Sequence, residues 1–127
     1  MIRYHLDTDF MLKAISVKGR EQTLLRRLSN TDAAIEISSI AWYEFCRGPR
    51  ALEQEALARS YLETDGIIAF DETVAASAAD LFRRLGSPRK RAADVAIAAT
   101  ALSRGARLLT ANTRDYSGIE GLKLGDE

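Results

Sequence analysis

Four acidic side chains stand at positions that a parallel α/β protein would bring together. Asp7 directly follows the segment IRYHL, Glu44 and Asp94 lie early in two predicted helices, and Asp115 follows the segment RLLTAN. Carboxylates that share a site repel one another and resist burial. A hard divalent cation such as Mg²⁺ or Mn²⁺ removes this cost. We therefore interpret the four acids as a metal site, and metal-assisted hydrolysis of a phosphodiester as its chemistry.

Each of these acids also has an ordinary structural explanation when it is taken alone. An aspartate such as Asp94 at the start of a helix commonly caps that helix. Glu44 fits a solvated helix surface, and Asp115 fits a turn. Asp7 is harder to explain in this way, because the end of a strand does not need an acid. The metal-site interpretation therefore depends on the four positions jointly.

Short apolar strands alternate with helices along the chain. Strands are predicted at 2–6, 34–38, 67–70 and 107–110, with a further short one at 122–124. Helices are predicted at 9–14 and 21–28, from Ser38 or Ser39 to the Gly48-Pro49 pair, and at 50–64, 72–85 and 92–103. This alternation favours an α/β fold with a parallel sheet. In such folds, sites lie beyond the carboxyl ends of the strands.

Burial can also be predicted for several elements. In the helix at 50–64, Leu52, Leu57 and Leu62 are expected to face inward. The apolar run IIAF at 67–70 suits a strand that is buried on both faces, and Asp71 is expected to cap the following helix. The segment AIEIS at 34–38 alternates and is β-branched, which is typical of a strand.

Composition and length narrow the class of protein. The 127 residues fit a single domain at 1–127, and 18 basic residues balance 18 acidic ones, which argues against simple coating of nucleic acid. The single cysteine, Cys46, cannot form an internal disulfide and is expected to pack in its helix. No apolar run approaches the ~20 residues that span a bilayer, and the N-terminus lacks the apolar stretch of a signal peptide. We expect a cytoplasmic protein that is not bound to a membrane.

Four segments together carry a family resemblance. They are LDTD at 6–9, SSIAWYEFCRG at 38–48, ADVAIAATALSRGARLLTAN at 93–112 and RDYSGIEGL at 114–122. With these segments the chain resembles the PIN-domain ribonucleases, and most closely the VapC-type toxins of type II toxin–antitoxin (VapBC) pairs. The resemblance covers essentially the whole chain and implies a three-layer α/β/α sandwich around a parallel sheet. It further implies an Mg²⁺- or Mn²⁺-dependent endoribonuclease that cleaves RNA, such as a structured transfer RNA.

The resemblance also suggests roles for individual residues. The first three family acids fall on Asp7, Glu44 and Asp94. The fourth acidic position is placed at Asp115, with Asn112 as a neutral helper. Asp7 and Asp94 are then the main metal ligands, Glu44 completes the site or orients the attacking water, and Asp115 supports a second metal or a water.

A second group of polar residues is expected to support these acids. Thr8 and Thr110 lie at strand ends and can hydrogen-bond the carboxylates. Asp9 is either an outer ligand or a helix cap, and we favour a cap or a supporting position. The only histidine, His5, lies inside the first strand and is interpreted as a half-buried residue without a catalytic role.

RNA is expected to approach along basic residues near the acids. Arg47 lies one turn beyond Glu44, and the basic run Arg89, Lys90 and Arg91 lies just before Asp94. Phosphate contacts of this kind position a nucleic acid without reading its sequence. A solvated charge run explains the basic run equally well. That run also departs from the family, in which many members carry a glycine and an apolar residue there.

The resemblance implies protein partners as well. These are a VapB-like antitoxin whose tail occupies the active-site groove, and a second copy of the chain in a homodimer. Apolar surface for a dimer can come from Leu52, Leu57, Tyr61 and Trp42, although Trp42 fits the core equally well.

Three other functions fit parts of the sequence. The sequence Asp7-Thr8-Asp9 also fits the D-x-D of haloacid-dehalogenase-like phosphohydrolases, but no well-placed lysine or paired-acid motif follows it. A receiver-type signalling domain would use Asp71 as its acceptor, but the lysine it requires is absent. A catalytically inactive PIN-like scaffold that binds RNA or protein is the main alternative, although the acids are all present.

Overall fold

The computed structural model describes residues 1–126, and these contain four strands and six α-helices. The strands are β1 (Arg3–Leu6), β2 (Ala34–Ser38), β3 (Ile67–Ile68) and β4 (Arg107–Leu109). The helices are α1 (Thr8–Ser16), α2 (Arg20–Ser29), α3 (Ser39–Cys46), α4 (Leu52–Tyr61), α5 (Glu72–Arg84) and α6 (Ala92–Ser103). Two short 3₁₀ turns, η1 (Arg89–Arg91) and η2 (Thr113–Tyr116), precede α6 and follow β4. The helix predicted at 92–103 therefore has its predicted bounds.

The four strands form one parallel sheet in the order β3-β2-β1-β4. The chain builds outward from β1 to β2 and β3, and then returns to place β4 on the other side of β1. The strands that follow β1 in the chain are thus placed first on one side of it and finally on the other. This makes the carboxyl end of β1 the switch point at which open α/β sheets place their sites.

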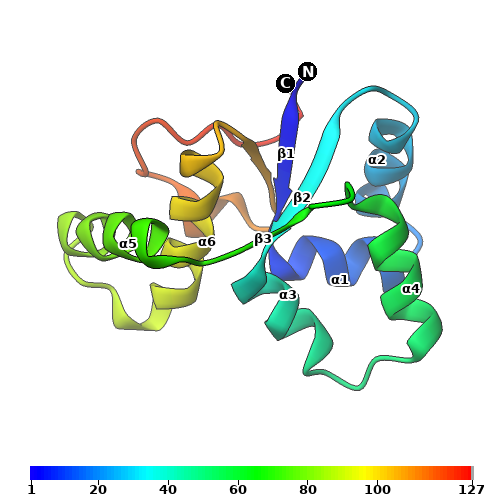
Figure 1. The fold of residues 1–127 in the computed structure, drawn as a ribbon, viewed down its shortest axis with the longest axis horizontal. Helices are drawn as coiled ribbons and strands as arrows, with labels where there is room; N and C mark the ends of the chain where they lie inside the picture. The colour runs from blue at the N-terminus through cyan, green and yellow to red at the C-terminus, as the bar shows by residue number, and fades with distance from the viewer. Residues whose placement is uncertain (127) are drawn as a thin grey trace.

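Helices cover both faces of the sheet (Figure 1). Helices α1, α2 and α4 lie on one side, where α1 packs against both α2 and α4, and α5 and α6 pack together on the other side. Helix α3 lies at the carboxyl end of the sheet and contacts both α1 and α6. The predicted three-layer α/β/α sandwich with a central parallel sheet is confirmed.

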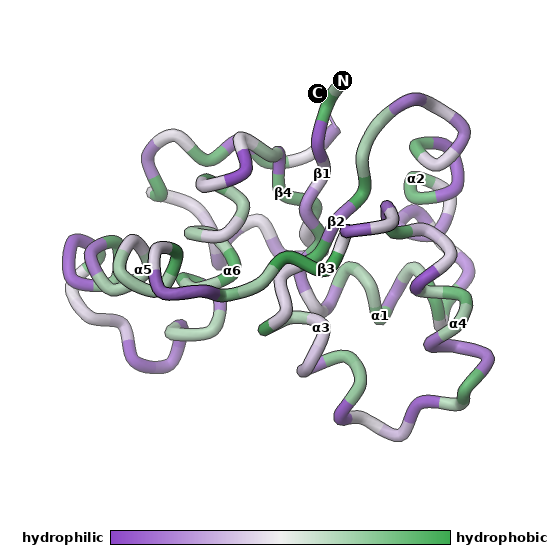
Figure 2. The backbone as a smooth tube through the Cα atoms, in the orientation of Figure 1, coloured by the Kyte–Doolittle hydropathy of each residue, from purple (hydrophilic) through white to green (hydrophobic). Residues whose placement is uncertain are grey.

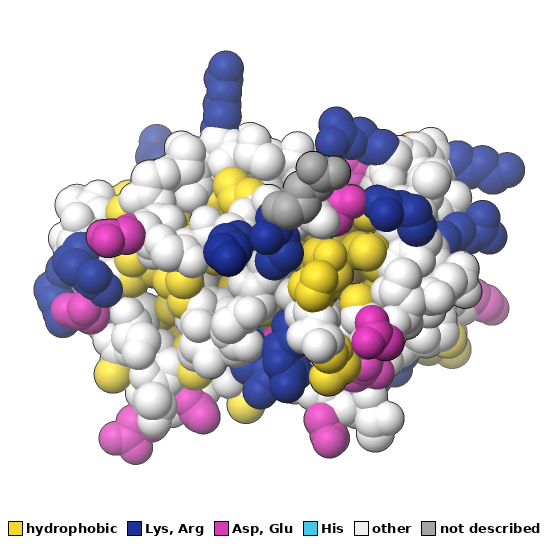
Figure 3. Space-filling view, turned by 90° about the horizontal axis from the view of Figure 1, so that it is seen from above, with side chains coloured by type: hydrophobic (Ala, Val, Ile, Leu, Met, Phe, Trp, Pro, Cys, Tyr) yellow, Lys and Arg dark blue, Asp and Glu magenta, His cyan; other side chains and the backbone are white. Residues whose placement is uncertain are grey.

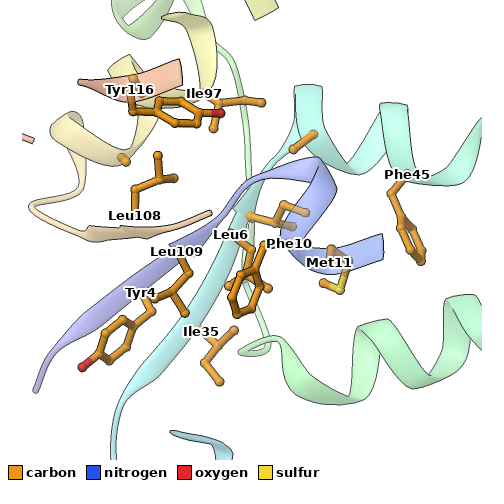
Figure 4. Packing of buried hydrophobic residues seen from close by; sticks show 14 of the residues in the cluster. Tyr4, Leu6, Phe10, Met11, Ile35, Phe45, Ile97, Leu108, Leu109 and Tyr116 are labelled. Atoms are coloured by element: carbon orange, nitrogen blue, oxygen red, sulfur yellow. The ribbon is translucent and has the colours of Figure 1, made fainter. Parts of the chain in front are cut away.

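The core lies on both faces of the short strands. The segment at β3 is hydrophobic, whereas the connection between α3 and α4 is largely hydrophilic (Figure 2). Tyr4, Leu6 and Leu109 are buried on the α1 side, where Phe10 and Met11 meet them (Figure 4). On the α6 side the core contains Ile97, Leu108 and Tyr116. Helix α6 is rich in alanine, which favours helix and allows close packing, and it ends before Gly105, whose φ of +62° favours glycine.

Two predictions about burial are wrong. Leu52 is 81% exposed and Leu57 is 42% exposed, so neither faces inward, and Ala58 is the buried residue of α4. The run IIAF forms only the two-residue edge strand β3, whose residues are half-buried. An edge strand has one neighbour, and here it lacks the double covering that the apolar run suggested. At the predicted strand 122–124, Leu124 makes an isolated bridge to Leu108.

Other local expectations hold. Asp71 caps α5 by accepting a hydrogen bond from the Val74 N–H at 2.9 Å. Ser38 caps α3 in the same way through the Ile40 N–H at 3.0 Å. Trp42 is partly buried and stacks on Phe45 with 5.5 Å between ring centroids.

A buried carboxylate in the middle of β2 is surrounded by cations that reach it from the amino end of the sheet. Glu36 is fully buried in β2, so the strand does not alternate between core and solvent. Its carboxylate lies 3.2 Å from Nδ1 of His5, accepts from Arg104 at 3.1 and 3.0 Å, and lies 3.5 Å from Arg3. His5 is also fully buried, rather than half-buried as predicted, because α6 covers this face of β1.

This end of the molecule is basic. Seen from above, Lys and Arg side chains gather on it (Figure 3). Four of them line one cavity, namely Arg3, Arg104, Arg107 and Lys123. None of the helices that residues 1–126 form combines the length and apolar character needed to cross a bilayer.

Candidate active site

At the opposite end of the sheet, the carboxyl ends of the strands open onto an acidic cavity of about 310 Å³. The four predicted acids, Asp7, Glu44, Asp94 and Asp115, all line it. They come from four different parts of the fold: the end of β1, the middle of α3, the first turn of α6 and the turn η2 after β4. The remaining lining residues are Thr8, Asp9, Leu12, Arg47 and Tyr116.

Asp7 is the most deeply buried of these acids. It is the N-cap of α1, where one carboxylate oxygen accepts from the Phe10 N–H at 2.8 Å, and the other accepts from the Thr110 hydroxyl at 2.5 Å. Burial raises the pKa of Asp7 to about 6, although these hydrogen bonds oppose the shift. No protein cation pairs with this carboxylate among residues 1–126.

Asp94 lies in the first turn of α6, but it does not cap the helix. Burial raises its pKa, and the negative charges of Asp115 and Glu44 raise it further. One of its oxygens lies 3.4 Å from the hydroxyl of Tyr116. The capping explanation for Asp94 is therefore not supported, and the side chain faces the other acids across the cavity.

Glu44 and Asp115 are each held by a neighbour. Glu44 accepts a hydrogen bond from the Thr8 hydroxyl at 2.6 Å and lies 4.0 Å from the guanidinium of Arg47. Asp115 accepts a hydrogen bond from the side-chain amide of Asn112 at 3.0 Å. Thr8 and Asn112 thus hold acids of the cavity, as Thr110 does.

A divalent cation fits the chemistry of this donor set, because hard oxygen ligands around Asp94 would be relieved of mutual repulsion. Within residues 1–126, no three acidic, histidine or cysteine side chains already surround a common point closely enough to hold an ion. The carboxylates of Glu44 and Asp115 instead bond to Thr8 and Asn112.

Other predicted site residues take less direct positions. Asp9 lines the cavity, but it is not the helix cap, because Asp7 itself fills that position. Arg47 lines the cavity, whereas Arg89 and Lys90 are exposed in η1 and do not. Arg91 turns inward and donates to the backbone carbonyl of Asp115, so its guanidinium supports η2 rather than standing free on the rim.

Two residues of the cavity were not foreseen. Tyr116 is buried and lies between the two central acids, since its hydroxyl interacts with Asp7 as well as Asp94. Burial and these two negative charges raise the pKa of Tyr116 far above its usual range, so the hydroxyl stays protonated. Leu12 follows Thr8 by one helical turn, and this spacing would have placed it on the same wall.

The alternative functions are not favoured by this geometry. Among residues 1–126 no lysine lines the cavity, and a phosphohydrolase of the D-x-D type would need one there. Asp71, the acceptor required by a receiver domain, caps α5 and does not line the cavity.

A parallel sheet with acids gathered at its switch point suits metal-assisted hydrolysis of a phosphodiester, and comparisons with known proteins identify the family. The PIN domain family matches residues 4–120, so this chain belongs to the PIN domain family, a family of nucleases. No curated protein sequence matched the chain.

Solved structures of toxin–antitoxin complexes contain chains with the same fold. The chain is 24% identical to a chain of VapBC2 from Rickettsia felis bound to a promoter DNA fragment, with a TM-score of 0.76 over 99% of both chains. It is 27% identical to a chain of DNA-bound VapBC from Salmonella typhimurium, with a TM-score of 0.73 over 99% of this chain and 98% of that one. It is 27% identical to a chain of a toxin–antitoxin complex from Klebsiella pneumoniae, with a TM-score of 0.69 over 94% of both chains.

Proposed function

We propose that this protein is the toxin of a toxin–antitoxin pair and acts as a divalent-metal-dependent endoribonuclease. The observation that carries the proposal is the convergence of Asp7, Glu44, Asp94 and Asp115 on one cavity of a PIN domain. Membership of a nuclease family supports phosphodiester hydrolysis. Similarity to VapBC complexes at 27% identity supports the toxin role.

In this mechanism, Asp7 and Asp94 would hold the cation, which would be Mg²⁺ or Mn²⁺. When bound, the cation lowers the pKa of the attacking water and stabilises negative charge on the phosphate. Glu44, on α3, would orient the attacking water. Asp115, in η2, would support a second cation or a water. Arg47 on the cavity wall contacts a substrate phosphate, since a guanidinium pairs well with phosphate oxygens.

Hydrogen bonds then fix the geometry of the acids. Thr110 and the Phe10 N–H hold both oxygens of Asp7, and the Tyr116 hydroxyl donates to Asp94. Such supporting contacts orient ligands and restrict their rotation. His5 takes no part, because it is buried inside β1 beside Glu36 and does not line the cavity.

The wider proposal follows from the same comparisons. The substrate is RNA, with a structured RNA such as transfer RNA as the expected target. The partners are a VapB-like antitoxin and a second copy of the chain. We further propose one PIN domain at 1–127, a cytoplasmic location and no association with membranes.

The test is RNA cleavage by the purified, antitoxin-free chain. A pool of small cellular RNAs is incubated with Mg²⁺ or Mn²⁺, and in parallel with EDTA. Asp94→Asn should lose cleavage by about 10²–10⁴-fold, because metal-assisted charge stabilisation contributes several kcal/mol. Asp32→Asn is the matched control, since Asp32 is exposed at the amino end of β2, away from the cavity.

Discrete fragments that require the cation and are lost only in Asp94→Asn would support the proposal. If the folded wild-type chain binds Mn²⁺ but cleaves no RNA, the inactive scaffold becomes the better explanation. Equal activity of the wild type and Asp94→Asn would exclude the assigned site.

A further inference from the structure

Helix α3 exposes an aromatic ring beside the acidic cavity. Tyr43 is 62% exposed, whereas the flanking helix residues Ala41 and Phe45 are fully buried. Tyr43 immediately precedes Glu44, a residue of the cavity wall. A large exposed aromatic ring has unmet capacity for stacking and apolar contact, and it lies here one residue from the proposed chemistry.

Arg47 connects this ring to the cavity. Its guanidinium carbon lies 5.4 Å from the centroid of the Tyr43 ring, within the range of a cation–π contact. The same guanidinium lies 4.0 Å from the carboxylate of Glu44, and Arg47 lines the cavity. The Arg47 guanidinium therefore lies between the exposed ring and the acids.

Two other arginine–aromatic pairs occur among residues 1–126, and they differ in one respect. Arg50 lies over Phe45 and Arg59 lies over Trp42, at 5.5 and 5.0 Å from the ring centroids. Phe45 is fully buried, and Trp42 is partly buried against the core. Only Tyr43 combines a bound guanidinium with a ring that is mostly open to solvent.

We propose that Tyr43 and Arg47 form a subsite for an unpaired nucleotide next to the scissile phosphate. The nucleotide base stacks on the open part of the Tyr43 ring, and Arg47 contacts the adjoining phosphate. This combination of an aromatic platform and a cation is how proteins bind single-stranded nucleic acid without reading its sequence. The inference rests on the proposed function and assigns Tyr43 as a stacking platform for the RNA beside Arg47.

The chemistry of the pair favours RNA over an apolar protein partner. An apolar partner over Tyr43 would desolvate the Arg47 guanidinium and offer it no anion besides Glu44 at 4.0 Å, which would be costly. A nucleotide supplies a π face for the ring and an anionic phosphate for the guanidinium. Both groups of the subsite are then satisfied by one ligand.

The experiment measures RNA binding without cleavage. The parent is the Asp94→Asn chain, and the probe is a short single-stranded RNA of mixed sequence that carries the fluorescent base 2-aminopurine. Anisotropy gives the dissociation constant, and quenching of 2-aminopurine reports stacking. The variants Tyr43→Ala, Tyr43→Phe and Arg47→Ala are made in this parent. Ile2→Ala is the control, because Ile2 is 54% exposed at the opposite end of the sheet.

Tyr43→Ala should weaken binding by about 5- to 150-fold, which corresponds to the about 1–3 kcal/mol measured for one stacked base. It should also abolish quenching, while Tyr43→Phe and Ile2→Ala retain both. Arg47→Ala should lower the slope of log K against log salt by about 0.7, the effect of one lost phosphate contact in a single strand. Tyr43→Ala should leave that slope unchanged.

Several outcomes would overturn the subsite. They are equal affinity and quenching in Tyr43→Ala and the parent, no RNA binding by the parent, and loss of self-association rather than RNA binding in Tyr43→Ala. Failure of the proposed function looks different, because it appears as absence of cleavage by the chain that retains Asp94. A cleaving wild type whose Tyr43→Ala variant binds RNA normally would refute the subsite alone.

Discussion

Asp7 and Glu36 are two buried carboxylates from neighbouring strands, and the protein shifts their pKa values in opposite directions. Glu36 lies in the middle of β2, while Asp7 follows β1 at the carboxyl end of the sheet. Burial alone would raise the pKa of Glu36, but hydrogen bonds from His5 and Arg104 and their positive charges outweigh it and lower the pKa. Burial raises the pKa of Asp7 to about 6, and Asp9 adds to the shift.

The difference separates a structural acid from a functional one. The charge of Glu36 is compensated by cations of the same chain, so its carboxylate has a structural role in the folded state. Asp7 has hydrogen bonds but no paired protein cation among residues 1–126, and other acids face it across the cavity. A site that concentrates uncompensated negative charge is suited to a cation from solution.

The largest effect on stability is expected for Glu36→Gln. This change leaves His5 and two guanidiniums around a neutral amide, and removing one partner of a fully buried ion pair costs about 3–5 kcal/mol. Because Arg3 and Arg104 can reach solvent, we expect a loss of about 2–4 kcal/mol in the free energy of unfolding. Urea denaturation at pH 7 measures it.

Glu120→Gln is the matched control, because Glu120 is exposed and outside this cluster. The lowered pKa also predicts a pH dependence. The stability from Glu36 is present above its unfolded pKa near 4.5 and is lost as the pH falls through the lower folded value. A Glu36→Gln chain as stable as the wild type would break the comparison.

Asp7→Asn should change stability in the opposite direction. In the presence of EDTA at pH 7, the variant should be more stable than the wild type by on the order of 1–2 kcal/mol, because an ionised buried carboxylate is replaced by a neutral amide. Asparagine is as good an N-cap as aspartate, so the cap on α1 is kept. Urea denaturation between pH 4 and pH 8 measures the difference.

The sign follows from the raised pKa of Asp7. Between pH 3.8 and about pH 6, Asp7 is more fully protonated in the folded state than in the unfolded state. Wild-type stability therefore falls as the pH rises through this window. The advantage of Asp7→Asn should therefore be absent near pH 4 and complete above pH 6. A constant advantage across this range would show that ionisation of Asp7 is not its cause.

The sequence predicted the acids of the site better than it predicted their surroundings. The positions of Asp7, Glu44, Asp94 and Asp115 at strand ends and helix starts follow from local patterns, and parallel topology brings such positions together. The bounds of α6 could be predicted because alanine propensity and Gly105 act locally. These features need no knowledge of which side chains meet.

The surroundings depend on contacts between distant segments. The Glu36–His5–Arg104 cluster joins two strands to the end of α6, and no local pattern places Arg104 over Glu36. Exposure of Leu52 depends on where α4 packs, which helical periodicity alone does not determine. Tyr116 could be seen in the sequence beside Asp115, but its approach to Asp94 depends on how η2 folds back over α6.

Tyr116→Phe sharpens the comparison with the smallest expected effect. The change removes only the hydroxyl, which donates to Asp94 at 3.4 Å and also interacts with Asp7, and the ring keeps its place in the core beside Ile97 and Leu108 (Figure 4). Loss of these weak contacts corresponds to about 0.5–1.5 kcal/mol, so we expect RNA cleavage and Mn²⁺ affinity to fall by about 2- to 10-fold.

Whether Tyr116→Phe weakens or strengthens Mn²⁺ binding shows whether the hydroxyl orients Asp94 or disperses the negative charge of the acids. If the hydroxyl mainly orients Asp94, calorimetric titration should show weaker Mn²⁺ binding in Tyr116→Phe, with an unchanged free energy of unfolding in EDTA. If it mainly disperses the negative charge of the acids, its removal should instead strengthen the attraction for Mn²⁺. Tighter binding would therefore assign Tyr116 to the same class as Arg104, a residue that compensates a buried carboxylate rather than presenting it to a cation.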